Sequence, residues 1–158
     1  MKAIIKFAGL LAITGMLGGT AVDANAATSQ NINTHAAACN PAGPSQATSI
    51  FYAVYGVWNA SSAVNYVVCP VARHPVTGPG QSFYVDGTNS GGQTTNFTLY
   101  SYTYTGTLES WVGFSSNLAT YDLYETLTSA SYYSYVSLFV TLPASGNGLF
   151  RGIAALDN

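Results

Sequence analysis

Charged side chains are scarce in this sequence, whose 158 residues include only four Lys and Arg and six Asp and Glu. From residue 27 onward the positive side chains are Arg73 and Arg151, against five acidic ones, so the formal net charge there is 2 − 5 = −3. Those five are Asp86, Glu109, Asp122, Glu125 and Asp157. Without a basic stripe, the chain is not expected to bind nucleic acid or an anionic membrane. Low charge also permits self-association.

Long hydrophobic runs are also few, and the clearest one extends from Phe7 to Leu17. It follows Lys2 and Lys6 and precedes Ala24-Asn25-Ala26, which has the small-residue pattern of a signal-peptide cleavage site. The run is about half the roughly 20 residues that a membrane-spanning helix needs. We therefore expect residues 1–26 to be a signal peptide and the protein to be secreted or periplasmic, with no membrane insertion after cleavage.

Cysteine occurs only twice, as Cys39 and Cys69. In an oxidising, exported setting an even pair predicts one disulfide. By the chain-entropy estimate, closing a loop of this length contributes roughly 3.5 kcal/mol to stability. A thiolate nucleophile is disfavoured, because an exported cysteine with an available partner seldom stays free.

The segment after the signal peptide, residues 27–48, is small, polar and interrupted by Pro41 and Pro44, which predicts an irregular N-terminal arm. Residues 49–58 and 63–69 are rich in β-formers and flank the turn-like sequence "NASS". We predict that they form a hairpin. Cys69, at the end of its second strand, would then lie where the returning arm can present Cys39.

Further strands are predicted from alternating apolar residues at 81–87, 94–106, 110–114, 119–127, 132–142 and 149–156. Segment 119–127 is ambiguous, since a helical turn would also bring Tyr121 beside Glu125, but we favour a strand. In segment 132–142 four apolar side chains share one face, Val136, Leu138, Val140 and Leu142, before Pro143 ends the strand. After the turn signal "ASGNG", one last strand follows. Short strands with turns between them indicate an antiparallel sandwich or barrel.

We favour an all-β fold: an antiparallel β-sandwich of about seven or eight strands, spanning residues 49–158, with one disulfide. The stretch "AAACNPAGPSQATSIFYAVYGVWNASSAVNYVVCPVARHP" and the later "FVTLPASGNGLFRGI" carry an early Cys-x-Pro and a Val-Cys-Pro strand end. In these features the chain resembles a loose set of uncharacterised exported bacterial β-domain proteins. The resemblance implies export, a disulfide and a β-fold, but no activity. Where those proteins often have an acidic residue after the arginine, His74 follows Arg73 here.

Catalytic groups are sparse. A Ser-His-Asp hydrolase needs a histidine base, and the sequence offers two, His35 in the arm and His74 in a loop. No serine lies in the glycine pattern of a nucleophile elbow. Glycoside hydrolysis needs two facing carboxylates. Asp122 and Glu125 would point to opposite faces of a strand, so we interpret these acids and Glu109 as solvated surface groups.

No metal or cofactor is expected. Asp86 to Gly91, "DGTNSG", resembles the start of a calcium loop, but the twelfth position is Phe97 instead of the bidentate Glu. We therefore interpret this segment as a hairpin loop. Zinc is disfavoured by the two distant histidines and the paired cysteines.

All twelve tyrosines lie beyond the signal peptide, and "LYSYTYTG" places Tyr100, Tyr102 and Tyr104 on one face of a strand, opposite Phe97 and Leu99. One interpretation is an ordinary half-exposed sheet face stabilised by cross-strand pairs. The other is a contact platform, since rigid rings with a polar tip cover area at small entropic cost. Trp58 and Trp111 are then possible anchors for stacking on sugars.

The sequence thus favours an exported, non-catalytic structural or interaction module at the cell surface or in the periplasm. Partners would be a second copy, another surface protein or a glycan. Segment 132–140 contains no Lys or Pro and, as an edge strand, would favour self-association. A carbohydrate-binding module that uses the tyrosine face is the first alternative, and a small secreted hydrolase is the second.

Overall fold

The computed structural model describes residues 31–73 and 81–156, and within these ranges the chain forms eleven β-strands in two antiparallel sheets. The predicted signal peptide lies outside the described residues. The prediction of an all-β, antiparallel fold is confirmed. The predicted number of seven or eight strands is wrong, because two short strands form in the arm predicted to be irregular and the strand predicted at 49–58 is two strands, 50–53 and 56–59.

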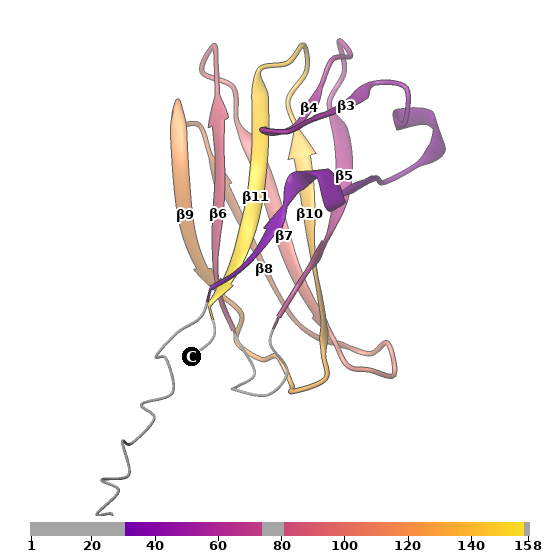
Figure 1. The fold of residues 1–158 in the computed structure, drawn as a ribbon, viewed down its shortest axis with the longest axis vertical. Helices are drawn as coiled ribbons and strands as arrows, with labels where there is room; N and C mark the ends of the chain where they lie inside the picture. Colours follow the sequence, from indigo (N-terminus) through magenta and orange to yellow (C-terminus); the bar gives the residue numbers. More distant parts are fainter. Residues whose placement is uncertain (1–30, 74–80, 157–158) are drawn as a thin grey trace, which may run out of the picture.

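Sheet A has the strand order β3-β4-β11-β6-β9, and β1 pairs with the C-terminal part of β11. Sheet B has the order β2-β5-β10-β7-β8. Figure 1 shows the two sheets as two layers of the molecule. The strands of sheet A are β1 (Ile32–His35), β3 (Ile50–Ala53), β4 (Gly56–Asn59), β6 (Ser82–Asn89), β9 (Thr120–Thr126) and β11 (Gly148–Leu156). Those of sheet B are β2 (Asn40–Pro41), β5 (Asn65–Val71), β7 (Thr95–Tyr102), β8 (Leu108–Ser116) and β10 (Tyr135–Leu142).

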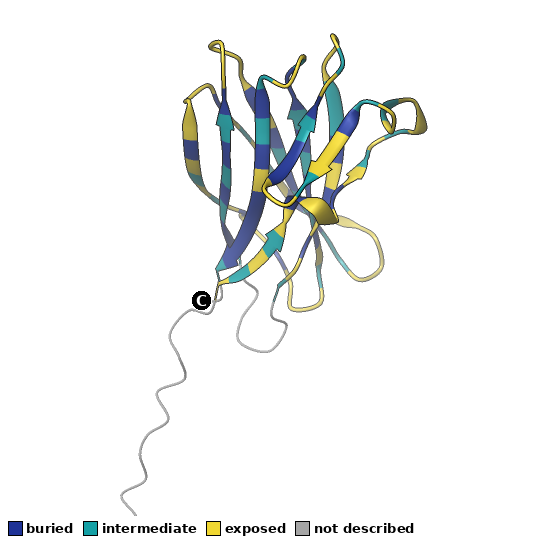
Figure 2. Ribbon diagram, turned by 45° about the horizontal axis from the view of Figure 1, so that its top comes forward, coloured by how far each residue is buried: buried dark blue, intermediate teal, exposed yellow. Residues whose placement is uncertain are grey.

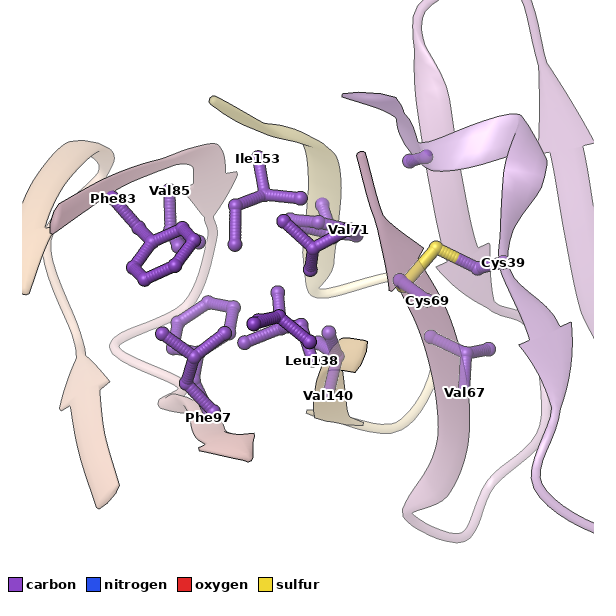
Figure 3. Close-up of a cluster of buried hydrophobic side chains, with 14 of the residues drawn as sticks. Cys39, Val67, Cys69, Val71, Phe83, Val85, Phe97, Leu138, Val140 and Ile153 are labelled. Atoms are coloured by element: carbon purple, nitrogen blue, oxygen red, sulfur yellow. A yellow bond between two sulfur atoms is a disulfide. The ribbon is translucent and has the colours of Figure 1, made fainter. Parts of the chain in front are cut away.

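The hydrophobic core lies between the sheets and follows the predicted alternation. In β10 the four alternating apolar residues are buried, and in β7 the side chains of Phe97 and Leu99 are buried while Tyr100 and Tyr102 are half-buried on the other face. The banding of buried and exposed residues along the strands is visible in Figure 2. Figure 3 shows residues of both sheets meeting in this core, among them Phe83 and Ile153 from sheet A and Leu138 from sheet B. Period-two sequence patterns therefore predict the core well.

The N-terminal arm is more regular than predicted. Residues 32–35 pair with β11, residues 40–41 pair with β5, and two short 3-10 helices, η1 (Ala36–Ala38) and η2 (Pro44–Gln46), complete it. The prediction of an irregular segment over 27–48 is therefore wrong for both strands. Pro41 is tolerated because β2 is an edge strand.

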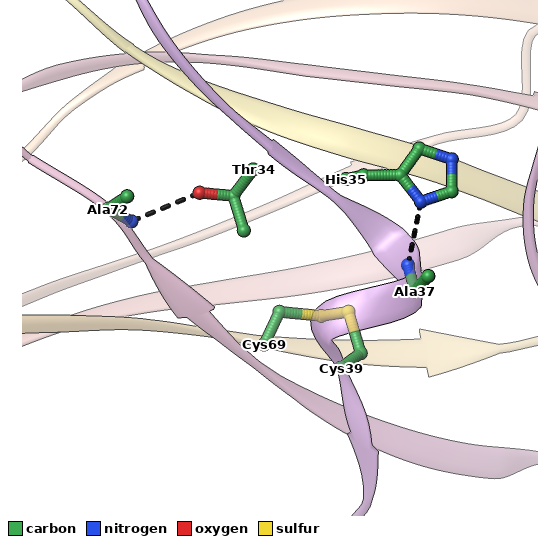
Figure 4. The surroundings of a disulfide bond; sticks show 6 residues. All are labelled: Thr34, His35, Ala37, Cys39, Cys69 and Ala72. Atoms are coloured by element: carbon green, nitrogen blue, oxygen red, sulfur yellow. Dashed lines mark hydrogen bonds between the residues drawn. A yellow bond between two sulfur atoms is a disulfide. The ribbon is translucent and has the colours of Figure 1, made fainter.

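The predicted disulfide is confirmed: Cys39 and Cys69 are bonded and both are buried. Because Asn40 pairs with Val68, the register places Cys39 directly beside Cys69. Figure 4 shows the bond where the arm crosses from β1 to β2, together with the hydrogen bond from the backbone N–H of Ala72 to Thr34 Oγ1, 3.0 Å. The disulfide thus links the arm to β5 at the point where the arm passes between sheets.

The predicted hairpin of 49–58 with 63–69 is wrong. Residues 50–53 and 56–59 form their own hairpin in sheet A, and β5 belongs to sheet B. The turn depends on Gly56, whose φ of 146° is rarely adopted by other residues and whose added Cβ would lie 2.4 Å from the carbonyl oxygen of Phe150. "NASS" is therefore the connection between the two sheets, where the buried Asn59 side chain donates to the carbonyl oxygens of Ala63 and Pro143.

The order of sheet B corrects the edge-strand prediction. Segment 132–140 was expected to offer a free edge, but β10 lies between β5 and β7 and is paired on both sides. Its strong alternation reflects a central position. The edge strands of sheet B are the short β2 and the nine-residue β8.

Two other local predictions have different outcomes. Residues 120–126 form a strand, as favoured. The hairpin loop predicted at 86–91 is wrong in its first half, because β6 continues to Asn89 and Asp86 is paired with Asp122 of β9. The turn after Pro143 is present, with φ of 60° at Ser145 and 71° at Gly146, but it joins β10 of one sheet to β11 of the other.

Candidate binding groove

An open groove of about 1130 Å³ lies on the outer face of sheet B, at the end where β5 finishes and β10 begins. Its tyrosines are well exposed: Tyr104 and Tyr133 each by 72%, Tyr135 by 67% and Tyr132 by 49%. The other lining residues are Asn40, Val68, Pro70, Val71, Arg73, Ser134, Val136 and Ser137. Rigid rings with polar tips and a few hydroxyl and amide groups are thus grouped in a concave, largely uncharged surface.

The register of sheet B explains why these side chains meet. Pro70 of β5 pairs with Ser137 of β10, and Ser137 pairs in turn with Tyr100 of β7. Side chains opposite one another in a sheet share a face, so Pro70, Ser137 and Tyr100 lie on the same face, and Pro70 and the small Ser137 line the groove. Two residues further along, on the same face, Tyr135 lies opposite Tyr102 and adds its ring.

Of the three tyrosines predicted to share one face of a strand, only Tyr100 and Tyr102 lie in β7. Tyr100 and Tyr102 share the outer face and are stacked, with ring centroids 6.1 Å apart. Tyr104 lies beyond the end of β7, in the turn closed by the hydrogen bond from the backbone N–H of Thr103 to the carbonyl oxygen of Thr107, 2.8 Å. Among the three, Tyr104 lines the groove, whereas Tyr100 and Tyr102 extend the aromatic face beside it.

Of the two tryptophans predicted as possible anchors, one lies on this face. Trp111 of β8 lies opposite Tyr100 and is 61% exposed. Trp58 belongs to β4 of the other sheet, so its predicted place in a common face with the tyrosines is wrong. Its ring is stacked within its own hairpin, 5.9 Å from Phe51 and 5.8 Å from Tyr55.

Three tyrosines of the groove, Tyr132, Tyr133 and Tyr135, were not singled out from the sequence, where they were assigned to a long strand. The strand starts only at Tyr135, and the two preceding tyrosines belong to the connection from β9. The signal that could have found them is composition: "SYYSY" combines three rings with serine and no charge immediately before an apolar alternation.

Among the described residues that line the groove, Arg73 is the charged one, and it is half-buried. Its guanidinium donates from Nη1 to Ser134 Oγ, 2.7 Å, and from Nη2 to the carbonyl oxygen of Ser131, 3.0 Å. Burial lowers its pKa, and the nearby carboxylate of Glu109 partly restores it. Its Nε is buried without a hydrogen-bond partner among the residues that the structure describes.

The predicted separation of the acidic residues is confirmed, with one addition. Asp122 and Glu125 lie on opposite faces of β9, and Glu109 belongs to β8 of the other sheet. However, Asp122 lies opposite Asp86 of β6, and its charge adds to the effect of burial in raising the pKa of Asp86.

Both ring nitrogens of His35, the histidine within the described residues, are engaged with the backbone. His35 Nδ1 accepts a hydrogen bond from the backbone N–H of Ala37, 3.0 Å, and Nε2 lies 3.1 Å from the carbonyl oxygen of Val54. An imidazole that accepts at Nδ1 donates at Nε2, so both nitrogens serve the local fold, as Figure 4 shows for Nδ1. His74 lies outside the described residues.

Residues 31–73 and 81–156 contain no group of three or more His, Cys, Asp or Glu side chains that could hold a metal ion. Over the same ranges, no helix has the length and apolar character needed to cross a membrane.

Comparisons with known proteins give little more. No family model and no curated protein matches the chain. It is similar to the carbohydrate-binding module TmCBM61 in complex with β-1,4-galactotriose, at 10% identity and a TM-score of 0.40, over 82% of this chain and 88% of that one. It is also similar to the enzymatically active domain of tailspike protein 4 of bacteriophage CBA120, at 12% identity and a TM-score of 0.37, over 83% of this chain and 18% of that one. Likenesses this weak support no argument about function.

Proposed function

We propose that the protein is an exported, non-catalytic recognition module that binds a carbohydrate chain in the groove of Tyr104, Tyr132, Tyr133 and Tyr135. The observation behind this proposal is the exposure of four tyrosine rings around one open, concave surface. Large apolar rings are normally buried, so a contiguous exposed group of them marks a contact site. Tyrosine presents an apolar ring face and a hydroxyl together, which matches the apolar faces and hydroxyl groups of a sugar.

Other features of the chain agree with this proposal. A buried disulfide suits an oxidising, exported setting. The groove is open to solvent, and its polar groups are mostly neutral: Asn40, Ser134 and Ser137. The absence of a base, nucleophile and orienting acid together in the described part of the chain favours binding over catalysis.

Affinity electrophoresis tests the proposal. Residues 27–158, oxidised, are run in native gels containing soluble neutral polysaccharides, namely galactan, xylan, mannan and hydroxyethyl cellulose. We expect at least one to retard the protein, and Tyr133→Ala and Tyr135→Ala to abolish the retardation. Tyr124→Ala is the matched control, because Tyr124 is 52% exposed on sheet A, away from the groove. Free migration in every gel, or equal retardation of all three variants, contradicts the proposal.

Self-association is a second candidate function, and the position of β8 favours it. This edge strand has no Lys or Pro, and from Ser110 to Ser116 it has no charge. Neutral, unprotected edges pair readily with other strands. A second copy pairing along β8 would extend sheet B and its aromatic face.

A further inference from the structure

The connection between β9 and β10, residues 127–134, places Tyr132 and Tyr133 at the groove. It begins with two buried apolar side chains, Leu127 and Ala130, which fix its first part to the core. The backbone N–H of Leu127 also donates to the carbonyl oxygen of Gln81, 2.8 Å. Beyond Ala130 the side chains are mostly exposed, so packing no longer determines where the two tyrosines lie.

Polar contacts at Ser131 replace packing at this point. Its backbone N–H donates to Glu109 Oε2, 3.2 Å, and its carbonyl oxygen accepts from Arg73 Nη2, 3.0 Å. The carboxylate of Glu109 thus binds the backbone N–H of Ser131, and the guanidinium of Arg73 binds its carbonyl oxygen. Arg73 reaches one step further, since its Nη1 donates to Ser134 Oγ, 2.7 Å. The two ends of the tyrosine pair are thus fixed by one guanidinium.

The carboxylate of Glu109 is itself held by further hydrogen bonds. Glu109 Oε2 also accepts from Ser101 Oγ, 2.9 Å. Burial opposes ionisation of Glu109, but hydrogen bonds from Ser131 and Ser101 leave its pKa below the usual range. The carboxylate stays ionised through mildly acidic conditions and remains a strong acceptor. Hydrogen bonds with a charged partner are stronger than neutral ones.

We infer that Arg73 and Glu109 are positioning residues of the groove, which hold Tyr132 and Tyr133 through Ser131, and that the ligand is an uncharged saccharide. This inference rests on the proposed function. Arg73 is the charged residue among the described lining, and each of its Nη groups already donates one hydrogen bond, to Ser134 and to Ser131. The nearby carboxylate of Glu109 offsets the charge of Arg73, so the groove offers the carboxylate of a uronic or sialic acid little net attraction, whereas a neutral sugar needs only ring faces and hydroxyl groups.

Four variants test the positioning role. Glu109→Ala and Arg73→Ala remove the contacts to Ser131. Glu109→Gln keeps an acceptor oxygen, and Arg73→Lys keeps the charge but cannot span Ser131 and Ser134 with a planar fork. The matched controls are Glu125→Ala and Arg151→Ala, which change charge equally on sheet A, away from the groove. All are assayed by native electrophoresis in the polysaccharide that retards the wild type, and by hydrogen exchange at the Ser131 amide.

We expect Glu109→Ala, Arg73→Ala and Arg73→Lys to weaken retention by about tenfold or more, the equivalent of one charge-assisted hydrogen bond. Glu109→Gln should keep most of the affinity, and the controls should keep all of it. The Ser131 amide should exchange faster in Glu109→Ala than in Glu109→Gln. Added salt should not change how strongly the neutral polysaccharide retards the wild type. Polygalacturonate and hyaluronan, which are acidic, should retard it less than the neutral polysaccharide does.

Each contrary result has a distinct meaning. Unchanged exchange at Ser131 in Glu109→Ala overturns the positioning role, whatever the ligand. Faster exchange with unchanged retention shows that the loop's position does not matter for binding, and also overturns it. Salt-sensitive, Arg73-dependent retention by an acidic polysaccharide overturns the uncharged ligand. Failure of every polysaccharide to retard the wild type overturns the proposed function, and the exchange data still decide whether Glu109 and Arg73 hold the loop.

Discussion

Asp86 of β6 and Asp122 of β9 lie directly opposite each other on the outer face of sheet A. Burial raises the pKa of Asp86, the adjacent Asp122 raises it further, and Arg151 partly offsets both. Between the ordinary aspartate pKa and this raised value, the folded protein binds more protons than the unfolded chain. Stability therefore falls as pH rises through that window and stays lower above it.

Replacing Asp86 with Asn should remove this loss. We expect the urea midpoint of Asp86→Asn to equal or exceed that of the wild type at neutral pH, and the advantage to shrink as pH falls below the ordinary aspartate range. Urea unfolding across this range measures it, with Glu125→Gln as the control for a change in net charge. If the urea midpoints of the wild type and of Asp86→Asn rose equally between the ordinary aspartate pKa and the raised pKa of Asp86, the predicted effect of Asp86 on stability would be contradicted.

A second prediction concerns two glycines that lie in strands but differ in surroundings. A Cβ on Gly87 would lie 2.4 Å from the carbonyl oxygen of Leu149 and against the ring of Tyr121. At Gly113 the nearest atom would be 3.7 Å away. Gly87→Ala should therefore cost about 1–3 kcal/mol or more through overpacking, whereas Gly113→Ala should be nearly neutral. Thermal and urea unfolding compare the two, and equal effects would contradict the described contact between β6 and Tyr121.

The disulfide supplies a third prediction. Its cysteines are 30 residues apart, so the double variant Cys39→Ser and Cys69→Ser should lose roughly 3.5 kcal/mol of stability. Because β2 has only two residues paired with β5, the arm should loosen first. Hydrogen exchange at Ala42, whose backbone N–H donates to the carbonyl oxygen of Tyr66, 3.0 Å, reports on that edge. Unchanged protection at Ala42 in the double variant would show that the arm does not depend on the disulfide.

The edge strand β8 leads to a fourth prediction. If copies pair along it, the mass in solution should increase with concentration, and Trp111→Lys should suppress the increase by placing a charge on the edge strand. Light scattering over a wide concentration range measures both. Tyr124→Lys is the matched control on sheet A. A constant monomer mass for the wild type excludes this second candidate function.

The sequence predicts the parts of the fold that depend on local alternation. The buried row of β10 and the inward Phe97 and Leu99 of β7 follow from period two alone. The cysteine pairing follows from composition and setting. These features depend on each residue's immediate neighbours in the chain, which the sequence displays directly.

Features that depend on distant pairing were not predicted. Gly56 forms a turn inside an apolar run because the backbone of Phe150 lies against it, and nothing near Gly56 in the sequence indicates this. Likewise β10 resembles an exposed edge in its lack of charge, although β5 and β7 cover both its sides. The groove unites residues from the arm, β5, the β7–β8 turn and the β9–β10 connection, so only the fold brings them together.

The most direct test of the account is to map the ligand onto the tyrosines. Aromatic NMR spectra of residues 27–158 are recorded while an oligosaccharide is added, prepared from the polysaccharide that retards the protein most. The account predicts the largest shifts at the rings of Tyr132, Tyr133 and Tyr135, and none at Tyr84 and Tyr124 of sheet A. Shifts centred on sheet A, or none at the groove with saturating ligand, would contradict it.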